Sequence, residues 1–151
     1  MKYFKYIILF FSIGIYSQSG KVVKIKDGDT IVVLDSLNIQ TTIRLAEVDC
    51  PESGQSFGKN AKNFTILQVA LKNVTYQIIT IDQYGRAVAK VFYSGKYLSE
   101  EIIKNGLGWH YKKYSNSERL AAFEELAKKN KKGLWSDKMA VAPWEWRKLK
   151  Y

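Results

Sequence analysis

Short runs of apolar and β-branched residues dominate the first third of the chain after residue 20. Runs rich in valine, isoleucine and threonine predict three strands, over residues 21–26, 30–35 and 39–46. The dipeptide Asp27-Gly28 and a polar stretch at 35–38 separate these runs. We therefore expect three consecutive strands joined by short turns.

The pattern then changes to a helical period. Over residues 59–72 the apolar positions recur every three or four residues, which predicts a helix with one apolar face: Ala61, Phe64, Leu67 and Leu71. Two further strand patterns follow at 74–81 and 87–93, joined through a polar turn that contains Gly85. We expect the helix to lie between the third and fourth strands.

Two more helices are predicted after the last strand. Ser99 is a suitable N-cap for a short helix over 100–105, which Gly106 would end. Ser115 and Glu118 have the spacing of a capping box, and Gly133 would stop that last helix. Its apolar face would consist of Leu120, Phe123 and Ala127.

The order of elements indicates the fold. Five short strands with a helix inserted between the third and fourth are typical of an OB-fold, a small Greek-key barrel that often binds oligonucleotides. The sequence thus predicts a mainly β, α+β domain with a five-stranded barrel and three helices. A chain of 151 residues suits one such domain, over residues 20–151.

The N-terminus has a different character. Lys2 and Lys5 precede a mainly apolar run of eleven residues at 6–16, and small residues follow at Ser17 and Ser19. This order is typical of a secretory signal peptide, and the apolar run is shorter than the roughly 20 residues that a membrane span needs. We expect residues 1–19 to be removed, with cleavage after Ser17 and an uncleaved anchor as the alternatives. The protein would be secreted or periplasmic, with no stable membrane association after cleavage.

Charge and cysteine usage narrow the chemistry. The formal charge is +10, and it falls to +8 without Lys2 and Lys5, which favours a polyanionic partner such as nucleic acid. Cys50 is the only cysteine and His110 the only histidine. An intrachain disulfide and a four-ligand zinc site of the usual kind are therefore excluded. Carboxylates, arginines and a hard cation remain as the means of catalysis.

The acidic and basic residues that could carry out such catalysis follow one another along the chain: Asp27 and Asp29, then Arg44, then Asp49 and Glu52, then Arg86. Asp29 and Asp49 flank strand ends and could supply oxygens to calcium, while arginine grips phosphate through paired hydrogen bonds. Glu52, turned aside by a proline, could activate water. Taken one at a time, each residue is explained as well by a turn or a surface ion pair.

The complete ordered set resembles the staphylococcal nuclease (thermonuclease) family. The matching segments are Asp-Gly-Asp-Thr at 27–30, Arg-Leu at 44–45, Val-Asp-Cys-Pro-Glu at 48–52, Gly-Gln and Phe-Gly within 54–58, Asp82 with Tyr-Gly-Arg at 84–86, Gly106 with Trp109, Gly-Leu-Trp at 133–135 and Pro-Trp-Glu-Trp-Arg at 143–147. The resemblance covers most of the chain after residue 20.

The resemblance implies calcium-dependent hydrolysis of DNA and RNA, without strong sequence preference, to 3′-phosphate and 5′-hydroxyl ends. The calcium ligands that it implies are Asp29, Asp49 and the carbonyl of Cys50. Arg44 and Arg86 would hold phosphate, and Glu52 would be the general base. Asp27 would support the turn beside the ligands.

Aromatic residues complete the implied site. Tyr84, with Tyr111 or Tyr114, would line the nucleotide pocket, where stacking on a base is worth roughly 1 to 3 kcal/mol. Cys50 stands where the founding member of the family has threonine, and only its carbonyl is needed. Gln83 stands where that enzyme has a lysine that contacts a terminal phosphate, so a preference for phosphorylated ends is not implied. We expect a monomer.

Two other functions remain open at this point. A catalytically silent OB module could bind single strands through a basic, aromatic surface. A hydrolase could use Cys50 and His110 as nucleophile and base, which requires an exposed thiolate.

Overall fold

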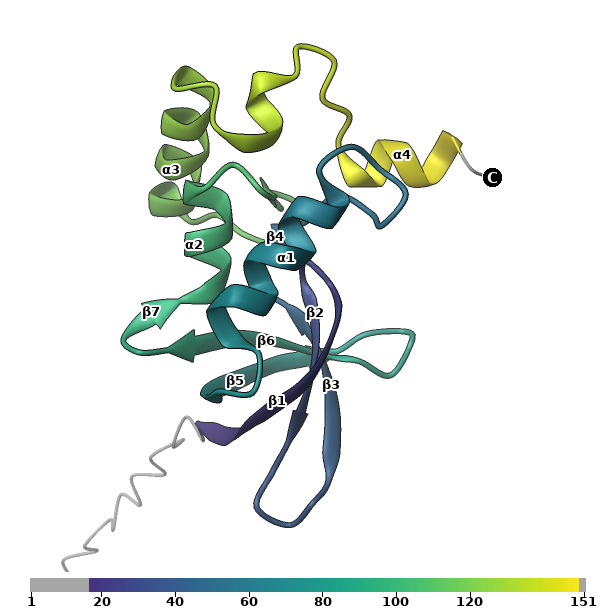
Figure 1. The fold of residues 1–151 in the computed structure, drawn as a ribbon, viewed down its shortest axis with the longest axis vertical. Helices are drawn as coiled ribbons and strands as arrows, with labels where there is room; N and C mark the ends of the chain where they lie inside the picture. The colour runs from purple at the N-terminus through teal and green to yellow at the C-terminus, as the bar shows by residue number, and fades with distance from the viewer. Residues whose placement is uncertain (1–16, 150–151) are drawn as a thin grey trace, which may run out of the picture.

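The computed structural model describes residues 17–149, which fold into a small barrel covered by helices on one side (Figure 1). The barrel strands are β1 (Gln18–Asp27), β2 (Thr30–Leu34), β3 (Gln40–Leu45), β5 (Asn73–Ile81) and β6 (Ala87–Tyr93). Three two-residue strands are β4 (Val48–Asp49), β7 (Lys96–Tyr97) and β8 (Trp109–His110). The helices are α1 (Gly58–Val69), α2 (Leu98–Lys104), α3 (Glu118–Lys129), the 3₁₀ turn η1 (Gly133–Ser136) and α4 (Pro143–Leu149).

The barrel closes through one parallel pair of strands. Antiparallel pairing gives the order β3-β2-β1-β5-β6, and β6 then pairs with β3 in parallel, with Ile43 opposite Ala87. The two-residue strands β4 and β8 form a separate antiparallel ribbon. The predicted α+β OB-fold with five barrel strands is confirmed.

Strict alternation of side chains builds the interior. In β6 the buried residues are Ala87, Ala89, Val91 and Tyr93, and the residues between them are half-buried. Because side chains alternate between the two faces of a strand, only every second position points into the barrel. The predicted bounds of β6 agree with the structure, and those of the other long strands agree within a few residues.

The buried face of α1 differs from the prediction. Ala61, Thr65 and Val69 are buried, whereas Leu67 and Leu71, which were assigned to the apolar face, are 75% and 70% exposed. Apolar periodicity could not find Thr65, because this polar side chain is buried through a hydrogen bond. Its hydroxyl donates to the carbonyl of Gly28 at 2.6 Å.

Both predicted serine caps are wrong. Helix α2 begins at Leu98, and Ser99 instead donates a hydrogen bond to the carbonyl of Ala46. Helix α3 is capped by Ser117, whose hydroxyl accepts from the amide of Leu120 at 3.3 Å. Sequence spacing alone cannot choose among neighbouring serines when one of them has a stronger partner elsewhere in the fold.

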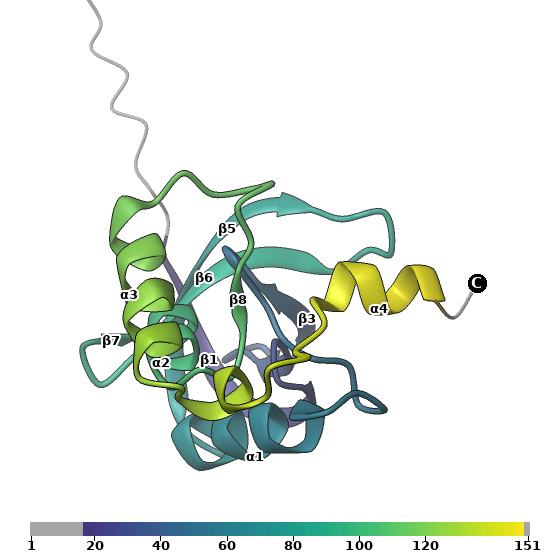
Figure 2. The ribbon, with the colours of Figure 1, turned by 90° about the horizontal axis from the view of Figure 1, so that it is seen from above.

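A fourth helix, α4, extends the predicted set of three within residues 17–149. In two perpendicular views, α4, the segment after β4 and the β5–β6 turn lie on the same side of the molecule (Figures 1 and 2). This side brings together segments from the first third, the middle and the end of the chain.

The predicted signal peptide lies almost entirely outside the described residues. Gln18 and Ser19, its last predicted positions, belong to β1 and pair with Tyr76 and Thr75 of β5. Among residues 17–149, no helix has the length and apolar character that crossing a bilayer would require.

Candidate active site

The turn between β1 and β2 places the first carboxylate. A Cβ added to Gly28 would come within 2.8 Å of the Ala61 side chain and 3.0 Å of the Cys50 side chain, so only glycine lets the turn approach so closely. Asp29 is 7% exposed, and its Oδ2 accepts a hydrogen bond from the amide of Cys50 at 2.7 Å. This hydrogen bond joins the turn to the segment that follows β4.

Arg44 on β3 joins the two predicted calcium ligands. Its Nη2 lies 2.7 Å from Asp49 Oδ1 and 3.3 Å from Asp29 Oδ2. Its Nη1 donates to the carbonyls of Leu45 and Val48, each at 2.7 Å. The side chain is 13% exposed, and although burial lowers its pKa, the attraction of Asp29 and Asp49 gives a net increase. Arg44 thus clamps two carboxylates, while its predicted contact with phosphate stays a prediction.

Glu52 is held beside Asp49 by Arg147, to which the sequence pattern assigned no role. Gln55 fixes the Glu52 backbone. The Glu52 amide donates to Gln55 Oε1 at 3.2 Å, and the Gln55 amide donates back to the Glu52 carbonyl at 2.9 Å. Arg147 of α4 donates from Nη1 to Glu52 Oε1 at 2.7 Å and from Nη2 to Asp49 Oδ2 at 2.8 Å. The only sequence indication of Arg147 was its place in the Pro-Trp-Glu-Trp-Arg motif.

Four carboxylates lie at this end of the barrel, and two guanidinium groups are bonded to three of them. The four carboxylates are Asp27, Asp29, Asp49 and Glu52, and the two guanidinium groups belong to Arg44 and Arg147. Burial, followed by repulsion from Asp29 and Glu52, raises the pKa of Asp27. Burial also raises the pKa of Asp49 and outweighs the hydrogen bond from Arg147. An additional cation would relieve this repulsion.

The donor set suits a hard cation that keeps part of its hydration. Asp29 and Asp49 supply carboxylate oxygens next to the same guanidinium nitrogen, and the Cys50 carbonyl belongs to the adjoining segment. Among residues 17–149 there is no group of three His, Cys, Asp or Glu side chains arranged to hold an ion. Calcium accepts six to eight oxygens in flexible geometry, so two carboxylates, a carbonyl and waters fit its chemistry.

Arg86 lies at the rim of the site but is bonded elsewhere. Its Nε donates to Asp82 Oδ2 at 2.7 Å, and its guanidinium lies 5.5 Å from the centre of the Tyr84 ring. The parallel register opposes Arg44 and Val88, so Arg86 lies two residues before the partner of Arg44 on the adjacent strand. Attraction by Arg86 also lowers the pKa of Asp27, against the stronger effect of burial.

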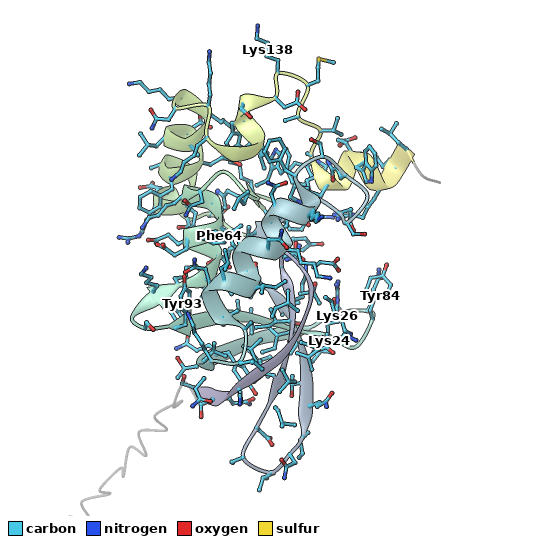
Figure 3. All side chains as sticks on the ribbon, in the orientation of Figure 1. Lys24, Lys26, Phe64, Tyr84, Tyr93 and Lys138 are labelled. Carbon is cyan, nitrogen blue, oxygen red and sulfur yellow. The ribbon has the colours of Figure 1, made fainter. Side chains whose placement is uncertain are left out.

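The predicted nucleotide-binding aromatics occupy two places. Tyr84 is 75% exposed on the β5–β6 turn and projects from the same side as Lys24 and Lys26 (Figure 3). Tyr111 stacks on Trp144 of α4, with ring centres 5.6 Å apart and planes 1° apart. Tyr114 is 67% exposed and meets Tyr111 edge-on. Tyr111 and Tyr114 therefore contact each other, whereas Tyr84 contacts Arg86.

A cavity of about 470 Å³ lies beside the Tyr111 group. Tyr111 and Trp144 line it together with four lysines: Lys112, Lys113, Lys128 and Lys148. Flat rings beside ammonium groups are suited to bases and phosphates of a single strand.

Cys50 and His110 do not have the properties of a nucleophile and its base. Cys50 is 3% exposed, and burial raises the pKa of its thiol well above the usual value. His110 is also buried, and its Nε2 lies 2.9 Å from the hydroxyl of Ser115. The accessible thiolate that a Cys/His hydrolase needs is absent, so this alternative is not supported.

Several known proteins are similar to this chain. Residues 42–137 match the family described as staphylococcal nuclease homologue. A protein of Haemophilus influenzae described as an uncharacterized endonuclease is 38% identical over 128 residues, which cover 85% of this chain and 72% of that protein. A micrococcal nuclease of Shigella flexneri is 35% identical over 141 residues, covering 85% and 80%.

Plant relatives are longer. A staphylococcal-like nuclease of Arabidopsis thaliana is 39% identical over 108 residues, which cover 72% of this chain and 33% of that protein. The chain spans about a third of the length of three plant relatives and about a fifth of the length of a fourth. The family match over more than half of the chain, together with the bacterial relatives, shows that this chain belongs to the staphylococcal nuclease family.

Proposed function

We propose that this chain is a calcium-dependent nuclease that hydrolyses phosphodiester bonds of DNA and RNA. The observation that carries the proposal is the convergence of Asp29, Asp49 and Glu52 around the guanidinium groups of Arg44 and Arg147. The names of the bacterial relatives point in the same direction. A family member that only bound nucleic acid would not need a buried, incompletely neutralised group of carboxylates.

In the proposed mechanism Asp29, Asp49 and the Cys50 carbonyl would hold calcium, which supplies a positive charge for the phosphoryl oxygens. Glu52, whose side chain is 37% exposed, accepts a proton from the attacking water. The water oxygen forms the new bond to phosphorus while the bond from phosphorus to the 5′ oxygen breaks, and the leaving 5′ oxygen takes up a proton from solvent. This gives 3′-phosphate and 5′-hydroxyl ends.

Of the two arginines predicted to hold phosphate, Arg86 can turn to it more readily than Arg44. Its ion pair with Asp82 is partly exposed to solvent, with 32% of the Arg86 side chain accessible. Pairs of this kind contribute about 1 kcal/mol or less, so exchanging Asp82 for a charged phosphate costs little. Arg44 would act chiefly by fixing the positions of Asp29 and Asp49.

Substrate binding would rest on phosphate contacts and stacking. Tyr84 lies at one rim of the site, and Tyr111 and Tyr114 lie beside the cavity with four lysines. Such contacts do not read base edges, so binding would be largely independent of sequence and would weaken as salt rises.

Export is part of the proposal. The charged and apolar pattern of residues 1–19 supports a cleaved signal peptide. Since Gln18 and Ser19 pair with β5, cleavage after Ser17 would leave β1 whole and is the better of the two predicted positions. Mass spectrometry of the exported protein would distinguish the two N-termini.

The central test is digestion of plasmid DNA and of RNA by the purified protein in calcium or in excess chelator. We expect degradation that calcium supports and the chelator abolishes. Degradation that persists in chelator would refute the calcium mechanism. Tight binding without degradation in either buffer would instead support the silent OB module.

A further inference from the structure

Arg147 is a third arginine of the site, and it comes from the last helix of the chain. Its two terminal nitrogens contact different carboxylates: Nη2 lies 2.8 Å from Asp49 Oδ2, and Nη1 lies 2.7 Å from Glu52 Oε1. A guanidinium is suited to such bridging because its donors are rigidly oriented in one plane. One side chain thus joins the proposed cation ligand to the proposed base.

This contact places a positive charge beside the oxygens that a cation would bind. Asp49 is 1% exposed, and each of its two oxygens already accepts from a guanidinium: Oδ1 from Arg44 at 2.7 Å and Oδ2 from Arg147 at 2.8 Å. A cation on either oxygen is therefore repelled by a neighbouring guanidinium and binds more tightly when that guanidinium moves away.

The two arginines differ in how easily they can leave. Arg44 is 13% exposed and also donates to two backbone carbonyls, so its departure would leave several buried groups without partners. The Arg147 side chain is 41% exposed, and water can replace its hydrogen bonds. Arg147 is therefore the arginine that a cation can displace from Asp49 more easily.

Helix α4 keeps Arg147 near the site after it yields. Trp144 of α4 stacks on Tyr111, and the side-chain amide of Gln55 donates to the carbonyl of Val141 just before the helix. These contacts do not involve the carboxylates of Asp49 or Glu52. Because the helix stays attached, the guanidinium remains at high local concentration and competes continually for Asp49.

We propose that Arg147 is a positioning residue that holds Asp49 and Glu52 together and competes with the divalent cation for Asp49. It thereby sets the cation affinity of the site. This inference rests on the proposed calcium-dependent function and deepens it.

The test is isothermal titration of calcium into the folded, nucleic-acid-free protein. We expect Arg147→Gln to bind calcium about tenfold more tightly, since releasing a half-exposed ion pair is worth on the order of the 1.4 kcal/mol that corresponds to tenfold in affinity. Arg147→Lys should bind with intermediate affinity, because an ammonium keeps the charge but cannot bridge both carboxylates.

Lys148→Gln is the matched control. It removes one positive charge from the same helix, but Lys148 is 70% exposed and pairs with Glu145 at 3.0 Å. Its calcium affinity should stay within about twofold of the wild type, because solvent screens such a charge. Thermal unfolding of each variant verifies that it is folded.

The outcomes separate the two proposals. Tighter binding in Arg147→Gln but not in Lys148→Gln supports the inference, and general structural damage would change affinity in the opposite direction. Equal or weaker binding in folded Arg147→Gln, with binding in the wild type, overturns the inference and leaves the calcium site standing. Absence of calcium binding in every variant overturns the proposed calcium-dependent function itself.

Discussion

Two groups of carboxylates lie on this small barrel, and their partners differ. The active-site cluster consists of Asp27, Asp29, Asp49 and Glu52, with Arg44 and Arg147 bonded to it. The structural cluster consists of Glu47, which accepts from Tyr97 of β7 and Ser115 after β8, and of Glu100 on α2, which accepts from Arg119 of α3. The first cluster has four carboxylates and two bonded guanidinium groups, whereas each carboxylate of the second has donors of its own.

The direction of the pKa shifts follows from this difference. Burial raises the pKa of Glu47, but hydrogen bonds from Tyr97, Ser115 and Lys90 outweigh it, so that the net shift is downward. Hydrogen bonds from Arg119 lead the effects that lower the pKa of Glu100 to about 2. In the active-site cluster the pKa values of Asp27 and Asp49 are raised instead. A lowered pKa means that the ionised carboxylate stabilises the fold, whereas raised pKa values are typical of carboxylates at functional sites.

The largest effect should come from the active-site cluster. Glu52→Gln removes the proposed base, so we expect the rate of hydrolysis to fall by about 10² to 10⁴-fold. The melting temperature should change little, because the Glu52 side chain is 37% exposed. Hydrolysis of a fluorescent oligonucleotide and thermal unfolding measure the two properties. A rate within a few-fold of the wild type would show that Glu52 is not the base.

Arg44→Lys should lower both the rate of hydrolysis and the stability of the fold. The ammonium cannot reproduce the contacts with two carboxylates and two carbonyls, so we expect a loss of about 10² to 10³-fold in rate. Unfolding free energy should fall by on the order of 2 kcal/mol, since buried carbonyls lose donors. Urea denaturation measures the second effect. A fully stable but inactive variant would assign Arg44 to phosphate binding alone.

A substitution in the structural cluster should lower stability without lowering activity. The Tyr97 hydroxyl donates to Glu47 Oε2 at 2.8 Å, and it lies 3.2 Å from the carbonyl of Ala46. Tyr97→Phe should therefore cost about 1 to 3 kcal/mol in unfolding free energy without changing kcat or calcium dependence. Loss of activity in a variant that remains folded would show that the two clusters are coupled.

The smallest effect concerns acid stability. The pKa of Glu100 is about 2 in the folded protein against 4.5 for an ordinary glutamate, so its ionised form stabilises the fold above about pH 4.5. That contribution disappears as the pH falls towards 2. Glu100→Gln should lower the melting temperature by a few degrees at pH 7, because Arg119 is largely exposed.

Melting curves between pH 7 and pH 3 test this expectation. The difference between wild type and Glu100→Gln should shrink as the pH is lowered. A difference that is independent of pH would attribute the effect to packing and not to the charge.

Local patterns predicted the barrel strands well and the helix details less well. β6 was predicted with its observed bounds because its alternation is regular and a glycine turn precedes it. The face of α1 was predicted correctly at Ala61 and Phe64 but not at Leu67 and Leu71, and the prediction missed Thr65, which is buried through a hydrogen bond to Gly28, 37 residues earlier. Ser117 caps α3 while Ser115 bonds to Glu47, 68 residues away. Contacts of such separation leave no periodic pattern.

The sequence by itself determined the barrel order and the residues of the site that lie on it. Asp29, Arg44, Asp49 and Glu52 are joined by short strands and turns, so their order along the chain largely dictates their proximity. Only the tertiary structure decided that Arg147 bridges Asp49 and Glu52, which are 98 and 95 positions away, and that Arg86 bonds to Asp82 at the rim. Packing of α4 and closure of β3 on β6 create these contacts, and neither event is encoded by local spacing.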